Sequence, residues 1–339
     1  MVVSEFLDMK EPRLSVLMSV YKEPIEWLKQ SVDSILQQTF KDFEFIIVCD
    51  NPSYTNGIDL LKSYSDKDKR IVLLFNGTNI GLTKSLNRGL AIARGDYIAR
   101  MDADDVSLSG RLEQQVQFLH THPEISVVHS YIQYFGDDIN ENKVRRSPLC
   151  SEKIIDTLMY SNCINHPAVM FRKADLLNNQ IKYDEIYRRS QDYALWLQMA
   201  LKGLKFATIP KVLFQYRLSG SQITYSHRAE QLADEKRIKR DFFRKVCEIN
   251  KIEYPKQLTR NYIKSFRANK ALGVNHIIII RALKFQMYYS LPKTITKFVR
   301  LIPDAVCMGL STKQTIIILL SFILDKRWSG YDMNYLIEK

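Results

Sequence analysis

The sequence predicts an α/β fold with a mostly parallel, mixed sheet, followed by a mainly helical, basic C-terminal region. Two observations predict the sheet: short apolar runs alternate with amphipathic helical patterns over the first 105 residues, and polar residues follow the end of each run. Strands separated by helices of ten or so residues are typical of βαβ units. A third observation, the concentration of positive charge in the last third, predicts the separate C-terminal region.

The expected elements follow one another in a regular order. Apolar runs rich in β-branched residues predict strands, and one-sided apolar spacing predicts helices. The predicted strands cover residues 14–21, 43–49, 70–75, 97–101, 125–135 and 165–172. The predicted helices begin near residue 24 and continue with 58–64, 81–94, 111–119 and 193–201. Gly95 follows the helix at 81–94 and is a common helix-stop signal.

The charge distribution divides the chain. At 339 residues, it is long enough for one large domain and a smaller one. Residues 1–225 carry 27 Lys and Arg against 27 Asp and Glu, whereas residues 226–339 carry 22 against 10. The whole net charge of +12 therefore lies in the last third. A break of this size indicates two regions with different partners, predicted here as domains 1–225 and 226–339.

Cysteine usage and hydropathy indicate the compartment. The five cysteines are scattered and form no CxxC pair, which argues for a reducing compartment and against a disulfide framework or a zinc site. The polar N-terminal residues predict no secretory signal. No run reaches the ~18 uncharged apolar residues of a membrane-spanning helix. We therefore expect a cytoplasmic protein.

Three aspartates, Asp102, Asp104 and Asp105, directly follow the predicted strand 97–101. Carboxylates this close repel one another unless a cation bridges them, and Mg²⁺ is typically held by one or two carboxylates together with substrate phosphates. One interpretation is a metal site that binds a phosphate-bearing substrate. The alternative is a solvated acidic turn that caps a helix starting at Ser107 or Ser109.

Polar residues also follow the other predicted strands. Ser19 and Tyr21 close the first, Asp50 and Asn51 the second, and Asn76 and Asn79 the third. Because ligands of open α/β sheets bind outside the carboxyl ends of the strands, this convergence favours the metal and ligand site. The first βα turn, residues 20–24, has no glycine, and no GxxxxGK[ST] is present. A dinucleotide-binding enzyme and a P-loop ATPase are therefore not indicated.

Four stretches carry a resemblance to a known family. They are LSVLMSVYKEP at 14–24, SVDSILQQTFKDFEFIIVCD at 31–50, NIGLTKSLNRGLAIARGDYIARMDADD at 79–105 and RLEQQVQFL at 111–119. In this order and spacing, residues 13 to about 225 resemble the bacterial family 2 glycosyltransferases of GT-A type fold, in particular those of capsule, exopolysaccharide and O-antigen synthesis. The usual Asp-Asp-Gly-Ser of that family is here Cys49-Asp50-Asn51-Pro52-Ser53.

The resemblance implies roles for individual residues. Ser19, Tyr21 and Asp50 would line a uridine pocket, with Asn79, Lys84 and Asn87 near the nucleotide or its sugar. Asp102 would bind the nucleotide and, with Asp104 and Asp105 in a DxD-type signature, Mn²⁺ or Mg²⁺; whether Asp104 or Asp105 is the ligand stays open. The candidate pyrophosphate or acceptor contacts are His166, Arg188, Arg189 and Arg217. The alternatives are a solvated helix face for Lys84 and Asn87, and an internally bonded polar group for His166.

Asp192 has two interpretations. By residue preference, Ser190 is a candidate N-cap. Asp192 would then lie at the N-terminal, positive end of the helix dipole of the predicted helix 193–201. The family, however, carries a Glu-Asp pair there whose aspartate is the catalytic base, and this chain has Gln191-Asp192. The implied reaction is an inverting transfer from a UDP-sugar to a saccharide acceptor carried on a polyprenyl diphosphate, with Asp192 taking the proton of the acceptor hydroxyl. The donor sugar stays open between galactose, glucose and N-acetylglucosamine.

The basic last third predicts contact with an anionic membrane surface. Basic helices with apolar faces suit such a surface, and residues 315–324 form an uncharged apolar run. The alternative is a helical cap that packs on the catalytic domain. We therefore expect the protein to lie at the inner face of the cell membrane. A nucleic-acid-binding protein would share the basic excess, but the first 225 residues are neutral and contain no recognised module. A sugar-1-phosphate nucleotidyltransferase would need a glycine-rich N-terminal loop, which is missing.

Overall fold

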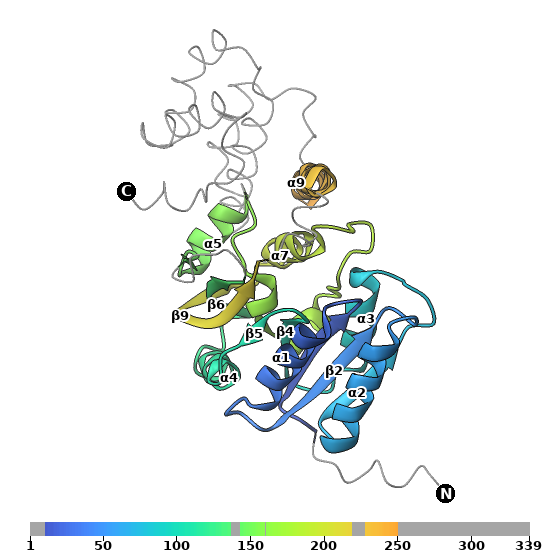
Figure 1. The fold of residues 1–339 in the computed structure, drawn as a ribbon. Helices are drawn as coiled ribbons and strands as arrows, with labels where there is room; N and C mark the ends of the chain where they lie inside the picture. The colour runs from blue at the N-terminus through green and yellow to red at the C-terminus, as the bar shows by residue number, and fades with distance from the viewer. Residues whose placement is uncertain (1–10, 137–142, 160, 219–227, 250–339) are drawn as a thin grey trace, which may run out of the picture. The chain divides into compact units, whose positions relative to one another are not determined.

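The computed structural model describes residues 11–136, 143–159, 161–218 and 228–249 (Figure 1). The chain divides into two compact units, one ending at Ile238 and one beginning at Lys239, so the long helix α9 (Arg228–Ile249) contains the division. The predicted boundary at 225 and 226 and the apolar run 315–324 lie outside the described residues. None of the helices in the described ranges is long and apolar enough to cross a membrane.

Four parallel strands form the N-terminal half of the sheet, in the order β3-β2-β1-β4. All four were predicted, because each is an apolar run; β1, β2 and β4 are largely buried from both faces, whereas β3 at the end of the sheet is mostly half-buried. Helices connect them along the chain, as the alternating pattern predicts (Figure 1). The elements of this half are β1 (Leu14–Val20), α1 (Ile25–Leu36), β2 (Phe43–Cys49), α2 (Thr55–Lys67), β3 (Ile71–Phe75), α3 (Leu82–Ile92) and β4 (Tyr97–Asp102).

Beyond β4 the sheet continues through β8, β6, β9 and β5 and becomes mixed. Strand β8 is antiparallel to both β4 and β6, whereas β6 and β9 run parallel. Since most paired residues lie in parallel pairs, the predicted mostly parallel, mixed sheet is confirmed. The elements of this half are β5 (Val106–Ser107), α4 (Arg111–Thr121), β6 (Val127–Phe135), β7 (Val144–Arg145), α5 (Ser151–Leu158), η1 (His166–Ala168), β8 (Met170–Arg172), α6 (Lys173–Asn178), α7 (Gln191–Leu201) and β9 (Phe206–Arg217).

Beyond the short elements β5, β7, α5 and α6, which were not predicted, two differences from the prediction involve proline. The expected single strand at 165–172 is a 3₁₀ turn, η1, followed by the short β8, because Pro167 lacks an amide hydrogen and its fixed φ suits the first turn of a helix. Strand β9 was not predicted. It contains Pro210, which cannot donate to a ladder, and the strand accommodates it where the register with β6 shifts between Ser130 and Tyr131.

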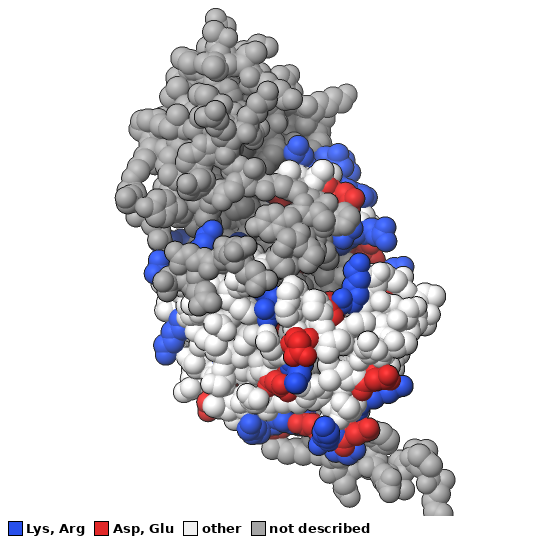
Figure 2. All heavy atoms as spheres, viewed as in Figure 1, with Lys and Arg blue, Asp and Glu red and all other residues white. Residues whose placement is uncertain are grey.

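Helices cover the two faces of the parallel strands differently. One face packs Val16, Phe45 and Met101 into a single apolar core with side chains from α1, α2 and α4. Helix α3 lies against the opposite face, where Gly89 makes the close approach possible: a Cβ there would lie 2.2 Å from Leu17 Cδ1. Figure 2 shows Lys and Arg mixed with Asp and Glu over the described surface on the face drawn, in keeping with the balanced charge of residues 1–225.

Gly95 has a different role from the predicted one. Helix α3 ends at Ile92, so Gly95 is not its cap. Instead, a Cβ on Gly95 would lie 2.5 Å from the backbone carbon of Leu14 and 2.5 Å from the backbone nitrogen of Ser15. The Gly95 amide also donates to Ser15 Oγ at 2.9 Å. The glycine is required because the chain passes directly against the first strand.

We expect Gly95→Ala to destabilise the fold by roughly 1–3 kcal/mol, the usual cost of forcing extra atoms into a packed site. Urea unfolding of the full chain would measure the loss as a lower midpoint at unchanged slope. Gly77→Ala is the matched control, because a Cβ there meets no atom within 4 Å of the described structure. Equal midpoints for the two variants would contradict the close approach.

Candidate functional site

The carboxyl ends of β1 and β4 lie side by side. Ser19 on β1 pairs in register with Asp102 on β4, so two of the residues predicted for nucleotide binding are neighbours across the ladder. Both are half-buried, and Tyr21, just beyond β1, is 39% exposed. This sheet edge therefore presents polar groups at the surface, as the strand-end pattern predicted.

The three aspartates occupy different environments. The Asp102 side chain is 32% exposed and pairs with the guanidinium of Arg100, which is buried. Asp104 is half-buried. Asp105 is fully buried, and its Oδ1 accepts the backbone amide of Arg217 at 2.8 Å. The alternative of a solvated turn that caps a helix is wrong, since Asp105 has no solvent exposure and α4 begins only at Arg111.

The negative charges of this turn perturb one another. Burial, then the charges of Asp102 and Glu23, raise the pKa of Asp104 to about 7, while Arg217 opposes the shift. Burial raises the pKa of Asp105 well above its ordinary value, with Asp104 and Asp102 adding to the effect. Burial also raises the pKa of Glu23. The turn thus holds more carboxylates than its surroundings neutralise, a condition that a bound cation relieves.

The donor set fits a cation that is shared with a substrate. Across the described ranges, no group of three His, Cys, Asp or Glu side chains is placed to hold a metal by itself. Asp102 and Asp104, the two half-buried carboxylates of the turn, could supply the one or two protein ligands that Mg²⁺ takes when phosphate oxygens complete its shell. The residues present therefore fit Mg²⁺ or Mn²⁺ bound together with a phosphate group.

Arg217 supports the aspartate turn from β9. Its Nε donates to the backbone oxygen of Asp104 at 2.7 Å, and its Nη2 donates to Gln30 Oε1 at 2.6 Å. The guanidinium also lies over the rings of Trp27 and Phe135, 4.8 and 4.3 Å from their centroids. With 8% exposure, Arg217 is a buried part of the turn's framework, and its predicted phosphate contact stays a prediction.

Asp50 holds the loop between β3 and α3. Its Oδ1 accepts Asn76 Nδ2 at 2.7 Å and the Ile80 amide at 2.8 Å, and its Oδ2 accepts the Gly81 amide at 2.8 Å. Asn79 is exposed on the same loop and accepts the Gly81 amide at 3.0 Å. Asp50 is 3% exposed, so it shapes this loop whatever else it contacts.

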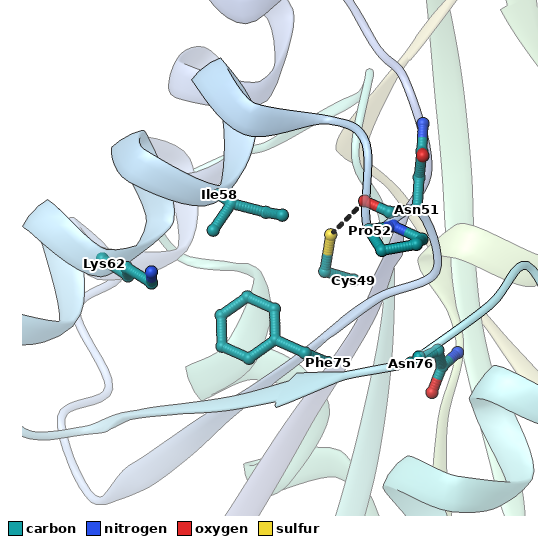
Figure 3. Close-up of a pocket in the computed structure, with 8 residues that line it drawn as sticks. Cys49, Asn51, Pro52, Ile58, Lys62, Phe75 and Asn76 are labelled. Atoms are coloured by element: carbon teal, nitrogen blue, oxygen red, sulfur yellow. Dashed lines mark hydrogen bonds between the residues drawn. The ribbon is translucent and has the colours of Figure 1, made fainter.

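A cavity of about 340 Å³ lies beside this strand end, between α2 and the ends of β2 and β3 (Figure 3). Cys49, which stands where the family has its first acidic residue, lies beside it with Ile58 and Phe75, and its thiol contacts the Asn51 carbonyl at 3.6 Å. Burial raises the pKa of this thiol. At the position where the family has its first acidic residue, this chain therefore has a neutral thiol, which lies beside the apolar residues that line part of the cavity. The cavity is lined by Cys49, Asn51, Pro52, Ile58, Lys62, Phe75, Asn76 and Gly77.

Of the candidate binding residues on α3 and in the 181–190 segment, some are hydrogen-bonded or ion-paired and others are exposed. Asn87 is bonded: its Nδ2 donates to the Tyr183 carbonyl at 2.9 Å and its Oδ1 accepts the Tyr183 amide at 3.1 Å. The solvated-face alternative is therefore wrong for Asn87. Arg189 pairs with Glu230 of α9 at 3.2 Å. Lys84 and Arg188 are exposed.

His166 lies in η1, buried under aromatic rings. Its Nε2 is 2.8 Å from the Tyr183 hydroxyl, and its ring contacts those of Tyr183 and Trp196 edge-on. Burial lowers its pKa well below the ordinary value, and the nearby Arg100 lowers it further. A neutral, bonded imidazole matches the alternative of an internally satisfied polar group.

Asp192 lies in the first turn of α7, half-buried. Asn162 Nδ2 donates to its Oδ2 at 2.6 Å. Burial raises the pKa of Asp192 to about 6, against the opposing effects of the Tyr193 amide and Asn162. Ser190 takes the predicted N-cap position but makes no capping bond, because its backbone (φ −136°, ψ 37°) is outside the β region from which a cap side chain reaches the first amides.

The buried hydroxyl of Tyr183 is affected by the charges of both Asp192 and Asp102. Burial raises the pKa of its hydroxyl, and the charges of both Asp192 and Asp102 raise it further, whereas Arg100 lowers it. Both carboxylates therefore lie within electrostatic reach of one buried hydroxyl.

Three residues of this site were missed from the sequence. Glu23 carried a signal, since it follows the end of β1 as the aspartates follow β4. Arg100 carried one too: a cation inside an otherwise apolar strand, two residues before Asp102. Asn162 carried none, because nothing along the chain shows that it meets a residue 30 positions away.

Comparisons with other proteins agree with this geometry. The family description "Glycosyl transferase family 2" matches residues 15–190. An uncharacterized glycosyltransferase of Methanocaldococcus jannaschii is 37% identical over 62% of this chain and 72% of its own length. The amylovoran biosynthesis glycosyltransferase AmsE of Erwinia amylovora is 32% identical over 62% of this chain and 77% of its own length.

Two solved structures share the fold. TarS 1–349 of Staphylococcus aureus, in complex with UDP-GlcNAc, aligns with a TM-score of 0.58 and 16% identity over 94% of each chain. The mannosyltransferase PcManGT of Pyrobaculum calidifontis, in complex with GDP-Man and Mn²⁺, aligns with a TM-score of 0.52 and 15% identity, over 94% of this chain and 89% of its own. Because the family match spans more than half of the chain and the fold agrees with these neighbours, the chain belongs to glycosyltransferase family 2 and has the GT-A type fold.

Proposed function

We propose that this chain is an inverting hexosyltransferase that moves a hexose from a UDP-sugar to a saccharide carried on a polyprenyl diphosphate, in the synthesis of a bacterial surface polysaccharide. One observation carries the proposal: the half-buried Asp192 carboxylate and Asp102 of the aspartate turn both lie within electrostatic reach of the buried Tyr183 hydroxyl. The name of AmsE supports a polysaccharide product, and the complex of TarS with UDP-GlcNAc supports a UDP-sugar donor.

The donor would bind at the strand ends. Ser19, Tyr21 and Asp50 line the side of the uridine, with Asn79, Lys84 and Asn87 toward the nucleotide or its sugar. The bonds of Asp50 to the Ile80 and Gly81 amides support this, because they hold the loop that carries Asn79 against the end of β2. Tyr21, at 39% exposure, offers a ring to the solvent side of the same edge.

Asp102 and Asp104 would hold Mn²⁺ or Mg²⁺. Burial favours Asp104 over Asp105 as the ligand, since Asp104 is half-buried whereas Asp105 is fully buried and bonded to the Arg217 amide. When bound, the cation would neutralise charge on the departing diphosphate. Arg217 and Arg100 hold the turn and the Asp102 side chain in place for this role.

Asp192 would act as the general base. It accepts the proton of an acceptor hydroxyl while that oxygen forms a bond to the anomeric carbon, and the bond from this carbon to the diphosphate oxygen breaks to release UDP. A base works best when its pKa is near the operating pH, and burial raises the pKa of Asp192 to about 6. Inversion at an α-linked donor yields a β-linkage.

A donor panel tests the proposal. We expect UDP release from one of UDP-galactose, UDP-glucose or UDP-N-acetylglucosamine in the presence of a polyprenyl-diphosphate-linked disaccharide. Release should be faster when vesicles that carry the acceptor contain anionic lipid, because residues 226–339 hold 22 basic against 10 acidic residues. Failure of all three donors to bind in calorimetry would contradict the donor assignment, and equal rates on neutral vesicles would contradict the membrane contact.

A further inference from the structure

The proposed base has one side-chain amide partner among the described residues. Asn162 lies in the loop that leads into η1, and its Nδ2 donates to Asp192 Oδ2 at 2.6 Å. The other carboxylate oxygen, Oδ1, accepts no side-chain hydrogen bond from the residues that the structure describes. The two oxygens of the carboxylate are therefore not equivalent.

The orientation of the Asn162 amide is determined by its second bond. Its Oδ1 accepts the backbone amide of Ile164 at 3.2 Å, and an amide hydrogen can only donate. The NH₂ group must then face Asp192, whose ionised carboxylate can only accept. A flipped amide would lose both bonds, so Asn162 presents a donor to the base in one orientation.

Both partners lie on anchored backbone. Arg145 Nη2 donates to the Asn162 carbonyl at 2.9 Å, and Ser147 Oγ donates to the next carbonyl, that of Cys163, at 2.8 Å. On the side of the base, the Tyr193 hydroxyl in the first turn of α7 is bonded to the Leu158 carbonyl at the end of α5. The distance between Asn162 and Asp192 is thus maintained by contacts outside the pair.

Few groups around Asp192 favour its charged form. Glu235 of α9 and the burial of the carboxyl oppose ionisation, whereas the Tyr193 amide, the amide of Asp192 itself and Asn162 favour it. The hydroxyl of Tyr183, in the 181–190 segment, lies within electrostatic reach of Asp192, and Arg145 donates to the Asn162 carbonyl. Asn162 contributes the side-chain hydrogen bond that stabilises the carboxylate.

We propose that Asn162 is a positioning residue for Asp192: its amide holds the carboxylate by Oδ2, keeps it ionised near neutral pH, and leaves Oδ1 to take the proton of the acceptor. The inference rests on the proposed function, because it assigns a support to the proposed base. It adds a residue that lies 30 positions from Asp192 along the chain.

The direct test measures the ionisation of Asp192 without any substrate. In a chain with ¹³C-labelled aspartate carboxyls, the Asp192 signal is assigned as the one that disappears in Asp192→Asn. We expect Asn162→Ala to raise its titration midpoint by about one unit or more, since a hydrogen bond to the charged form is lost. Asn162→Asp should raise the midpoint further, because a second carboxylate then faces Asp192. The matched control is Asn179→Ala, which removes an amide bonded to the Asp175 carbonyl at the end of α6.

The kinetic test uses the pH dependence of UDP release with the donor found by the panel. Because the base must be ionised, kcat/KM falls as pH drops through the pKa of Asp192. The acidic limb should therefore move to higher pH in both Asn162 variants by the shift measured by NMR, while the calorimetric affinity for UDP stays unchanged. Asn179→Ala should keep the wild-type limb.

The outcomes separate the inference from the proposed function. An unchanged Asp192 midpoint in Asn162→Asp, which keeps the size of the side chain and the acceptor for Ile164, would overturn the inference even if Asn162→Ala failed to fold. A shifted midpoint together with full turnover by Asp192→Asn would instead overturn the assignment of Asp192 as base. If the Asn162 variants release UDP more slowly but the acidic limb of kcat/KM against pH does not move, Asn162 has only a structural role.

Discussion

Asp192→Asn is expected to lower turnover by ~10²–10⁴-fold, the usual contribution of a general base, while UDP affinity stays unchanged. The amide keeps the size of the side chain but cannot accept the proton of the acceptor hydroxyl. Turnover of the wild type should also fall as pH drops through about 6, since burial raises the pKa of Asp192 to that value and only the ionised form is a base. UDP release under saturating donor measures the rate.

The control for this variant is Asp184→Asn. Asp184 lies in the 181–190 segment that precedes α7, and its Oδ1 accepts the Ile186 amide at 3.0 Å, a bond that an asparagine oxygen also makes. It should retain wild-type turnover. Near wild-type turnover by Asp192→Asn, with the acceptor present, would leave Asp192 only the role of an acidic residue in the first turn of α7.

Chelation by EDTA should abolish transfer, and added Mn²⁺ or Mg²⁺ should restore it. Asp104→Asn should weaken metal affinity by at least the ~10–100-fold that follows removal of even a supporting residue of a metal site, and UDP-sugar binding should weaken with it. Because a ligating carboxylate must be deprotonated, metal affinity should rise with pH through the Asp104 pKa of about 7. Calorimetry with Mn²⁺ in the presence of UDP measures both effects.

Asp105→Asn tests whether Asp105 is a metal ligand or only supports the fold of the aspartate turn. The buried Oδ1 of this residue accepts the Arg217 amide, and an asparagine oxygen can keep that bond. We therefore expect the variant to retain its metal affinity and to stay folded. Full activity of the wild type in excess EDTA would exclude a catalytic cation, and a larger loss in Asp105→Asn than in Asp104→Asn would reverse the assignment of the ligand.

The N-terminal half of the fold could be predicted because its signals are local. Strands β1 to β4 are apolar runs, and the α1 and α3 patterns show one apolar side, so composition and spacing were enough to predict them. Strand β9 could not be predicted, because it carries Pro210 and depends on its pairing with β6 and on a register shift that no local pattern encodes. Gly95 was misassigned for a related reason: the requirement for glycine comes from β1, about 80 positions away.

The candidate site divides in the same way. By itself the sequence determined the acidic turn after β4, the polar strand ends and the acid at the start of α7, because strand ends and helix ends are local features. Only the tertiary structure decided that Asp105 is buried under Arg217, that Asn87 bonds to Tyr183, and that Asn162 meets Asp192. Burial and pairing depend on side chains that distant segments bring together, and these contacts determine how exposed each carboxylate is and which partners it has.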